Sequence, residues 1–187
     1  MYPILLEILL VITLFVCIGG IIFQAAYLYG GFKTLKSAPF VPVAPSDLEI
    51  IIKYLKLTPD AKLYDLGSGD GRILKHAMEH YPTITTVGYE IGPMPRIISK
   101  IKLRKYKNKV AIINQNFLTA DVHDATHVFL YLFPEVLAKL EPIFDKQLSP
   151  GTRVVSIDFV FPTRQPIETV DITGAGKITK QLYVYQW

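Results

Sequence analysis

Cysteine is almost absent from this chain of 187 residues, and the motif of a serine nucleophile is missing. Cys17 is the only cysteine, so no disulfide can form within the chain, which fits a reducing compartment. No serine stands in the G-x-S-x-G pattern of a hydrolase elbow. Basic side chains outnumber acidic ones by only 20 to 16, and this excess alone is no argument for a nucleic-acid partner.

Charged side chains are missing from residues 8–32, which are rich in Leu, Ile, Val and Phe. A helix that spans a membrane needs about 20 such residues. The alternative, a cleaved signal peptide, begins with a basic region and has a shorter apolar core, whereas residues 1–7 contain no Lys or Arg. We therefore predict that residues 1–32 form a transmembrane anchor, which contacts the lipid bilayer through residues 8–32.

The charges beside this segment predict its orientation. Lys33 and Lys36 follow the apolar run, and Glu7 precedes it. Because basic residues favour the cytoplasmic side, we expect a single-pass protein whose carboxy-terminal domain lies in the cytoplasm.

Three prolines make residues 33–45 an extended linker. This linker serves either as a spacer above the membrane or as a flap over a ligand. A capping box at Ser46–Glu49 predicts the start of the next helix. We expect residues 46–187 to form one domain.

Residues 64–72 read Tyr-Asp-Leu-Gly-Ser-Gly-Asp-Gly-Arg, with three glycines at alternate positions. The apolar run 62–66 precedes the glycines, and a helical pattern follows at 73–81. Strand, glycine turn and helix let a backbone approach a nucleotide-like ligand, because a Cβ would block the tight turn. Arg72 stands where a dinucleotide-type G-x-G-x-x-G needs a third glycine. The candidate binding residues of this loop are Asp65, Gly67, Ser68, Gly69, Gly71 and Arg72.

Two later segments supply further candidates at the ends of predicted strands. Glu90 directly follows the β-rich run 83–89 and lies about 20 residues beyond the glycine loop. At this position, nucleotide-binding sheets place a carboxylate on the ribose hydroxyls. After the strand 110–113, Asn116 could hydrogen-bond the adenine of such a ligand and Phe117 could stack on it. A surface acid, a turn residue and a core residue are the respective alternatives.

Apolar strands alternate with helical patterns through the rest of the domain, which is typical of an α/β fold with a parallel sheet. Two β-rich runs around a glycine turn end the chain and predict an antiparallel hairpin. The expected strands are 62–66, 83–89, 110–113, 128–133 and 153–159, with the hairpin at 170–172 and 181–187. The expected helices between them are 73–81, 94–109 and 134–148.

Acidic residues are missing from the predicted helix 94–109, which carries seven Lys and Arg side chains. The helix presents either a solvated outer face or a surface for anionic lipid, where each basic residue contributes about 1 kcal/mol. A nucleic-acid surface is less favoured because regular interleaving with aromatic side chains is missing, and we expect no nucleic-acid partner.

Metal-ligating side chains occur in two pairs. His76 and His80 are one helical turn apart, and His123 and His127 flank Asp124. A zinc site needs three or four protein ligands, and the sequence places no third ligand clearly for either pair. We therefore predict no metal.

From Pro39 onward the sequence resembles small class I methyltransferases that use S-adenosylmethionine and are related to protein-lysine methyltransferases. These relatives include archaeal broad-specificity enzymes and mitochondrial enzymes that act on the ATP synthase c subunit and the adenine nucleotide translocase. The resemblance is carried by Pro39–Pro42, Tyr64–Arg72, Gly88–Glu90, Leu130–Val136 and Pro150–Ser156. It implies a Rossmann-like seven-stranded methyltransferase sheet, S-adenosyl-L-methionine as cofactor, and a protein substrate with an accessible lysine.

The resemblance also implies site residues outside the glycine loop. It favours the flap interpretation of the linker, with Val41 and Pro42 at the cofactor, and it places Tyr131 and Asp158 beside the methyl acceptor. Val43 replaces a threonine that is common in the relatives, and Ile157 replaces a histidine. These departures concern the substrate more than the cofactor.

Two other functions remain compatible with the sequence. A membrane-anchored methyltransferase could act on a lipid or another apolar small molecule that it reaches from the bilayer. A non-catalytic module could keep the cofactor fold and only bind. For Tyr131 and Asp158 themselves, the alternative is that they are core or strand-end residues.

Overall fold

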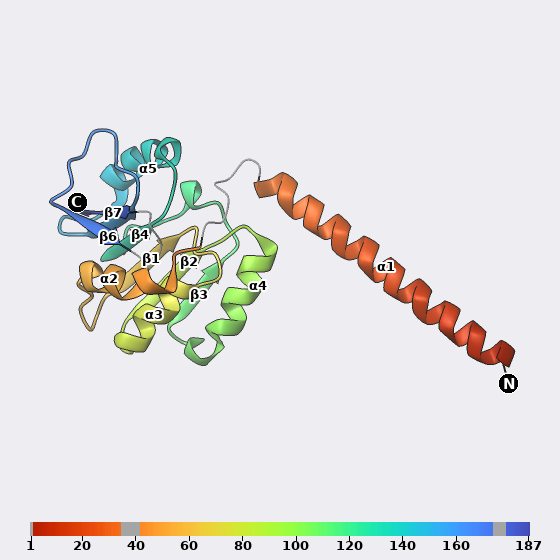
Figure 1. Ribbon diagram of the computed structural model, residues 1–187. Helices are drawn as coiled ribbons and strands as arrows, with labels where there is room; N and C mark the ends of the chain where they lie inside the picture. Colours follow the sequence, from red (N-terminus) through yellow and green to blue (C-terminus); the bar gives the residue numbers. More distant parts are fainter. Residues whose placement is uncertain (1, 35–41, 174–178) are drawn as a thin grey trace. The chain divides into compact units, whose positions relative to one another are not determined.

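The computed structural model describes residues 2–34, 42–173 and 179–187. The chain divides into two compact units, Met1–Pro39 and Phe40–Trp187. The first unit contains a single long helix, and the second contains the sheet and the candidate site (Figure 1).

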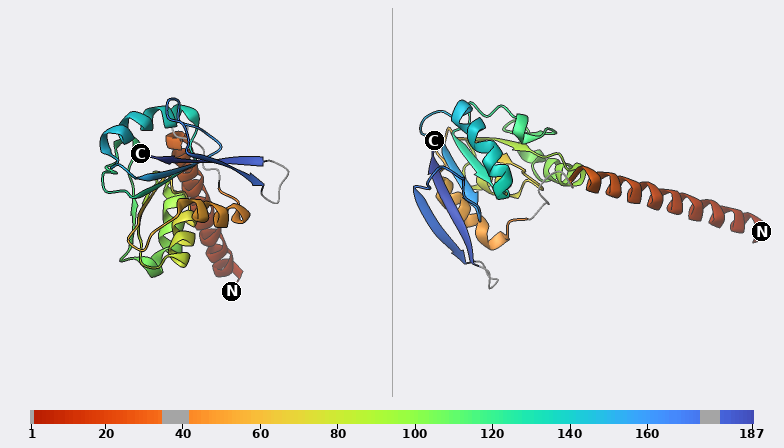
Figure 2. Two further views of the ribbon diagram at one scale, coloured as in Figure 1. Left: turned by 90° about the vertical axis from the view of Figure 1, so that its left-hand side faces the viewer. Right: turned by 90° about the horizontal axis from the view of Figure 1, so that it is seen from above.

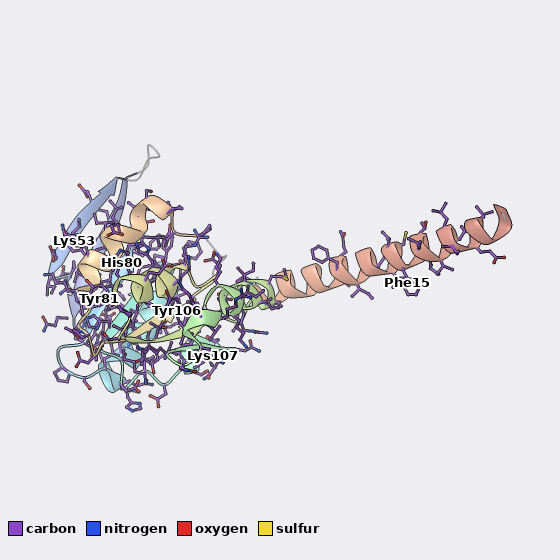
Figure 3. The ribbon with its side chains drawn as sticks, turned by 90° about the horizontal axis from the view of Figure 1, so that it is seen from below. Phe15, Lys53, His80, Tyr81, Tyr106 and Lys107 are labelled. Atoms are coloured by element: carbon purple, nitrogen blue, oxygen red, sulfur yellow. The ribbon has the colours of Figure 1, made fainter. Side chains whose placement is uncertain are left out.

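Helix α1 (Tyr2–Thr34) is the element that the charge-free run predicts. Its segment Leu6–Ala25 has a mean hydropathy of 2.7, and all of its side chains are exposed. By length and composition, it is the one helix in the described ranges that can cross a membrane. Large apolar side chains such as Phe15 project from the helix on several sides, as Figure 3 shows.

A seven-stranded sheet forms the centre of the second unit, in the order β3-β2-β1-β4-β5-β7-β6 (Figure 1). Strands β1 to β5 pair in parallel, and β7 pairs antiparallel with both β5 and β6. The strands are β1 (Lys62–Leu66), β2 (Thr85–Tyr89), β3 (Val110–Ile113), β4 (His127–Leu130), β5 (Arg153–Ile157), β6 (Glu168–Thr173) and β7 (Thr179–Gln186). The predicted α/β sheet and its closing hairpin are confirmed.

Helices cover both faces of this sheet, as the two views of Figure 2 show. The helices are α2 (Pro45–Leu55), α3 (Arg72–His80), α4 (Pro93–Lys102) and α5 (Pro134–Gln147), with short 3₁₀ turns η1 (Arg104–Tyr106) and η2 (Phe117–Thr119). Apolar residues of α2 and α3 bury one face of the sheet, and α5 buries the other with Leu137, Leu140 and Phe144. Since alternate residues of a strand point to opposite faces and both faces are covered, β1, β4 and β5 are buried over most of their length.

Several elements end earlier than the sequence predicts. Strand β4 stops at Leu130 and β5 at Ile157. Asp158 has a φ of +63°, in the left-handed region, so the extended backbone of β5 cannot continue through it. The basic helix α4 ends at Lys102 and passes into η1, which shortens the predicted helix 94–109.

The predicted capping box at Ser46–Glu49 is wrong. Helix α2 begins at Pro45, with Ala44 as its N-cap and no side-chain cap. Proline favours the first helical position because its missing N–H would have no partner there. Ser46 instead donates a hydrogen bond of 2.9 Å to the carboxylate of Asp47.

Candidate active site

The candidate site lies where β1, β2, β4 and β5 reach their carboxyl ends. The strand order runs outward in opposite directions from β1 and β4, which makes this the point of topological reversal. Ligands of open α/β sheets bind in the crevice outside the strands at such a point. Leu66 is paired with Leu130 in the sheet, so Gly67 and Tyr131, the residues that follow them, leave neighbouring strands side by side.

The glycine loop after β1 turns through three left-handed residues. Gly67, Gly69 and Gly71 have φ values of +91°, +53° and +74°. The backbone N–H groups of Gly67 and Ser68 both donate to the carbonyl of Tyr89, at 2.9 and 3.0 Å. The loop is therefore tied to the end of β2, and its glycines leave open the cradle that a Cβ would narrow.

Two acidic side chains lie beside this loop, at the carboxyl ends of β1 and β2. Asp65 is buried in β1, and its pKa is raised well above the ordinary value, mainly by burial and further by the negative charges of Glu90 and Asp70. Glu90 accepts a hydrogen bond of 2.8 Å from the N–H of Gly69 and another from the N–H of Gly92. The carboxylate of Glu90 thus lies against the loop, where a residue that binds ribose hydroxyls is expected, and its charge favours a cationic ligand.

Asp70 and Arg72 turn away from the cradle and hold the loop in place. Asp70 forms ion pairs with Arg72 and with Lys102 of α4. Burial alone would raise the pKa of Asp70, but the hydrogen bonds and charges of these two partners outweigh it and lower the pKa to about 2. Arg72 also donates to the carbonyl of Val43. The sequence predicts that Arg72 binds the ligand, whereas in the structure its guanidinium binds Asp70 and the carbonyl of Val43.

The other predicted cofactor residues have different surroundings. The hydroxyl of Ser68 is buried toward Gly88 and has no hydrogen-bond partner among the described residues. Asn116 caps η2 by accepting a hydrogen bond of 3.0 Å from the N–H of Leu118. Phe117 lies beside the cradle, 3.8 Å from where a Cβ of Gly67 would stand, and is therefore placed to contact a ligand held there. Pro42 is exposed.

Val41 lies outside the described residues. Val43, which stands where the relatives often have threonine, is buried, and its carbonyl is the group that Arg72 binds. The start of the second unit is therefore attached to the end of the glycine loop.

Tyr131 and Asp158 meet at the ends of β4 and β5. The Tyr131 hydroxyl donates to Asp158 Oδ2 at 3.0 Å, and the N–H of Gln181 donates to Asp158 Oδ1 at 3.2 Å. Burial, followed by the charges of Asp158 and Asp47, raises the pKa of Tyr131 to about 12, so the hydroxyl keeps its proton at neutral pH. The two predicted acceptor-site residues are thus brought together from positions 27 residues apart.

Sequence reasoning missed Asp47 and Lys180, which complete this cluster. Asp47 of α2 is buried and accepts a hydrogen bond of 3.3 Å from Lys180 Nζ. The same Nζ lies 5.5 Å from the centroid of the Tyr131 ring. The two residues are separated by 133 positions, and only the packing of α2 against the sheet brings them together.

The members of the second histidine pair contact other side chains. His123 is bonded to Asp121 at 2.6 Å, and His127 Nδ1 to the hydroxyl of Thr126 at 2.8 Å. Asp124 pairs with Lys62 and accepts a hydrogen bond from Tyr64. Each member has its own partner at the amino-terminal edge of the sheet, opposite the glycine loop.

Comparison with known proteins identifies the chemistry of this site. A model of the ANTKMT methyltransferase domain matches residues 65–168, more than half of the chain. A protein-lysine N-methyltransferase of Saccharolobus islandicus is 31% identical over 149 residues, which cover 79% of this chain and 92% of the relative. The chain belongs to the ANTKMT methyltransferase domain family. It is a methyltransferase that uses S-adenosyl-L-methionine.

Further relatives agree with this assignment. The adenine nucleotide translocase lysine N-methyltransferase of Mus musculus is 29% identical over 168 residues, which cover 86% of this chain and 69% of the relative. A Salinibacter ruber structure, described as an RNA methyltransferase in complex with S-adenosyl-L-homocysteine, superposes with a TM-score of 0.71 at 34% identity. That match covers 78% of this chain and 93% of the other. The resemblance to small lysine methyltransferases is confirmed.

The residues of this methyltransferase fit its cofactor. S-adenosylmethionine carries a positively charged sulfonium and an amino group, and it supplies an electrophilic methyl group. The glycine cradle leaves room for the ligand, and the carboxylate of Glu90 would hold the ribose hydroxyls and attract a cation.

We predict that Gly71→Ala destabilises the protein by about 2–4 kcal/mol. Its φ of +74° strains any residue with a Cβ, and the Cβ would stand 2.9 Å from Leu103 Cδ1 and 3.0 Å from Ser99 Cβ. Gly151→Ala is the matched control, because Gly151 has a φ of +95° but no atom within 4 Å of its Cβ position. Urea unfolding should show a loss of only about 1 kcal/mol for the control. Equal losses would mean that the contact with α4 contributes nothing.

We predict that Glu90→Gln weakens the binding of S-adenosylhomocysteine by about ten- to a hundredfold. The amide carries no charge and cannot accept from both N–H groups that the carboxylate binds, and such charge-assisted bonds contribute about 1.5–3 kcal/mol. Glu79→Gln is the control, since Glu79 lies on α3 and pairs with Lys75 and Lys105. Calorimetric titration measures both. An unchanged affinity for Glu90→Gln would contradict its role at the ribose.

Proposed function

We propose that this protein transfers the methyl group of S-adenosylmethionine to the side-chain amine of a lysine in a protein substrate. The observation that carries the proposal is the pairing of Tyr131 with Asp158 beside the glycine loop. The names of the curated relatives, which are lysine N-methyltransferases, support the same acceptor.

The cluster around Tyr131 has the chemistry that binds an alkylammonium group. Lys180 of the chain itself places its ammonium over the Tyr131 ring and against the buried carboxylate of Asp47. An aromatic face and a desolvated carboxylate are the two features that attract such a cation. A substrate lysine that enters beside Tyr131 would meet the same face and the second carboxylate, that of Asp158.

The lysine must lose its proton before its nitrogen can attack. A free lysine has a pKa near 10.4, and a nearby carboxylate favours the charged form, so Asp158 serves to bind and orient the ammonium. Burial acts in the opposite direction and favours the neutral amine. Phe133 and Phe159, whose ring centroids are 5.6 Å apart, flank the pair in sequence and can exclude water there. Once the ammonium proton has passed to solvent, the neutral nitrogen would accept the methyl group of the bound cofactor, whose sulfur keeps the electrons of the broken sulfur–methyl bond.

The flap is part of this proposal. Residues 42–44 precede α2, and the carbonyl of Val43 is fixed by Arg72 at the end of the glycine loop. Asp47 lies in the first turn of α2. A segment attached in this way connects the cofactor loop to the acceptor cluster. We propose that the flap, with Pro42, covers the methionine end of the cofactor.

We further propose that the methyltransferase domain works at the cytoplasmic face of a membrane. Helix α1 supplies the anchor by its length and composition. Helix α4 supplies a second contact, because four large apolar side chains on it are exposed at positions i, i+3, i+4 and i+7. These are Met94, Ile97, Ile98 and Ile101, with 52%, 49%, 39% and 61% of their surface exposed.

The charge of the α4 region fits an anionic bilayer. Lys100, Arg104 and Lys107 are exposed and have no acidic partner within the part of the chain that the structure describes. Lys107 follows α4 and η1, as Figure 3 shows. An amphipathic helix with an apolar face and basic flanks lies in the interface of anionic membranes, and each basic residue adds about 1 kcal/mol.

We predict that membranes incubated with the full-length protein and tritiated S-adenosylmethionine acquire label in protein, as methyl-lysine after hydrolysis. Asp158→Asn should lower this transfer by about ten- to a hundredfold while S-adenosylhomocysteine still binds. Asp145→Asn, a change of an exposed acid paired with Arg164, is the control. Label in the organic extract would indicate a lipid acceptor, and label in RNA would indicate the activity for which the Salinibacter protein is described. Either result would overturn the lysine proposal, as would tight binding without any transfer.

We predict that a tryptophan at position 97 is quenched by brominated lipids when the full-length protein is reconstituted in anionic vesicles. Ile97→Trp is made in a Trp187→Phe background, and Ile167→Trp is the control, because Ile167 is also exposed but lies outside α4. Quenching at position 97 should fall in neutral vesicles or when Lys100 and Arg104 become Glu. Equal quenching at both positions would contradict a specific contact of α4.

A further inference from the structure

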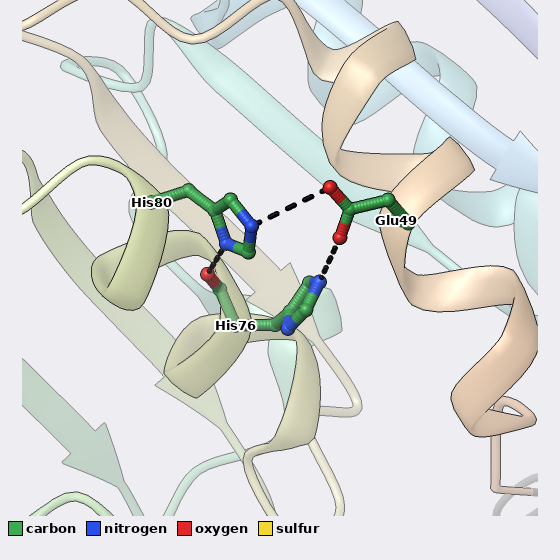
Figure 4. Close-up of side chains that lie close together, drawn as sticks. All are labelled: Glu49, His76 and His80. Carbon is green, nitrogen blue, oxygen red and sulfur yellow. Dashed lines mark hydrogen bonds and ion pairs between the residues drawn. The ribbon is translucent and has the colours of Figure 1, made fainter.

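Three side chains that the methyltransferase chemistry does not use converge on the outer surface of α2 and α3. His76 and His80 project from α3, and Glu49 projects from α2 between them (Figure 4). His76 Nε2 lies 2.8 Å from Glu49 Oε2, and His80 Nε2 lies 3.4 Å from Glu49 Oε1. The three ligand atoms all lie within 4.8 Å of one another, so a single ion can contact each of them.

The hydrogen bond at the far side of the His80 ring determines which nitrogen is free. His80 Nδ1 lies 2.9 Å from the carbonyl of His76. A carbonyl only accepts, so Nδ1 must carry the proton, and in the neutral ring Nε2 then presents a lone pair. This lone pair faces a carboxylate oxygen, and either a proton or a metal ion between the two atoms removes the repulsion between them. Metal-bound histidines typically donate their other N–H to a backbone carbonyl in this way.

The surrounding helices hold the ligands in a fixed relation. His76 and His80 are four residues apart, so they lie one above the other on α3. Their ring centroids are 4.5 Å apart. Helix α2 packs against α3 through buried residues such as Ile52 and Ala77, which keeps Glu49 opposite the two rings. The site therefore follows from the packing of two helices.

We propose that Glu49, His76 and His80 bind a divalent transition-metal ion, with Zn²⁺ as the best match. Two imidazoles and one carboxylate suit Zn²⁺, whereas Ca²⁺ and Mg²⁺ prefer oxygen ligands alone. Three protein ligands leave at least one position for water. This reverses the sequence prediction of no metal, which rested on the missing third ligand for the pair His76 and His80.

The ion has a structural role. His80 stands eight residues beyond Arg72, about 12 Å along α3, so the ion is remote from the methyl transfer. It would join α2 to α3 at their outer surface, and Arg72 joins α3 to the segment just before α2 through the carbonyl of Val43. The bound ion thus restrains α2, which carries Asp47 of the acceptor cluster, against the helix that begins at the glycine loop.

Calorimetric titration of the untagged, metal-free full-length protein with Zn²⁺ at pH 7.5 tests the proposal. We expect one ion per chain, and at least about tenfold weaker binding for Glu49→Gln and for His80→Ala. His123→Ala is the matched control, because His123 is also exposed and bonded to an acid but lies at the opposite edge of the sheet. Binding that is equally strong in all variants, or absent from the wild type, would overturn the proposal.

Two spectroscopic and structural readouts separate a built site from loose binding to a surface histidine. Co²⁺ should give the visible absorption of a four- or five-coordinate ion in the wild type and in His123→Ala, but not in Glu49→Gln. Free Zn²⁺ at about 100 times Kd should raise the Tm by about 5 °C in the same two proteins. A six-coordinate spectrum or an unchanged Tm would contradict a metal ion that links α2 to α3. These readouts need neither S-adenosylmethionine nor a methyl acceptor, so their outcome does not depend on the proposed function.

Discussion

The left-handed turn after β1 is the constraint on which the rest of the site depends. Three residues with positive φ bring the chain from the sheet into α3 while leaving an open cradle. The turn is held on one side by Glu90, which accepts from Gly69, and on the other by Asp70, which pairs with Arg72 and Lys102. Glu90 therefore lies at the cradle. Asp70 is paired with two basic side chains and only supports the loop.

The proposed acceptor site depends on the register of the sheet. Pairing of β1 with β4 and of β4 with β5 brings Tyr131 and Asp158 next to the glycine loop, although each lies far from it in sequence. The left-handed backbone at Asp158 ends β5 and turns its carboxylate toward the Tyr131 hydroxyl. Parallel strands therefore place cofactor and acceptor groups at one edge, and the antiparallel β7 contributes Lys180 to the same edge.

Sequence reasoning succeeded where one local segment determines the outcome. The glycine spacing predicts the turn, and the end of β2 then places Glu90 on it, because neighbouring parallel strands finish together. Contacts between distant segments were not predictable. Asp47 meets Lys180 across 133 positions, and Glu49 meets His76 across 27, only because α2 packs on the sheet and on α3. Composition predicted α1 but gave no sign that the apolar side chains of α4 would be exposed.

The electrostatics of the acceptor site limit how it can work. A carboxylate that attracts a lysine ammonium also opposes its deprotonation, so tight binding and a high concentration of neutral amine are in conflict. In this chain the conflict is eased because the Asp158 carboxylate already accepts hydrogen bonds from Tyr131 and from the backbone of Gln181, which spread its charge. Asp47, the more deeply buried acid, is occupied by Lys180. In the proposed function, the incoming lysine would therefore meet a partly satisfied carboxylate and an aromatic face, a combination that orients the amine without holding its proton strongly.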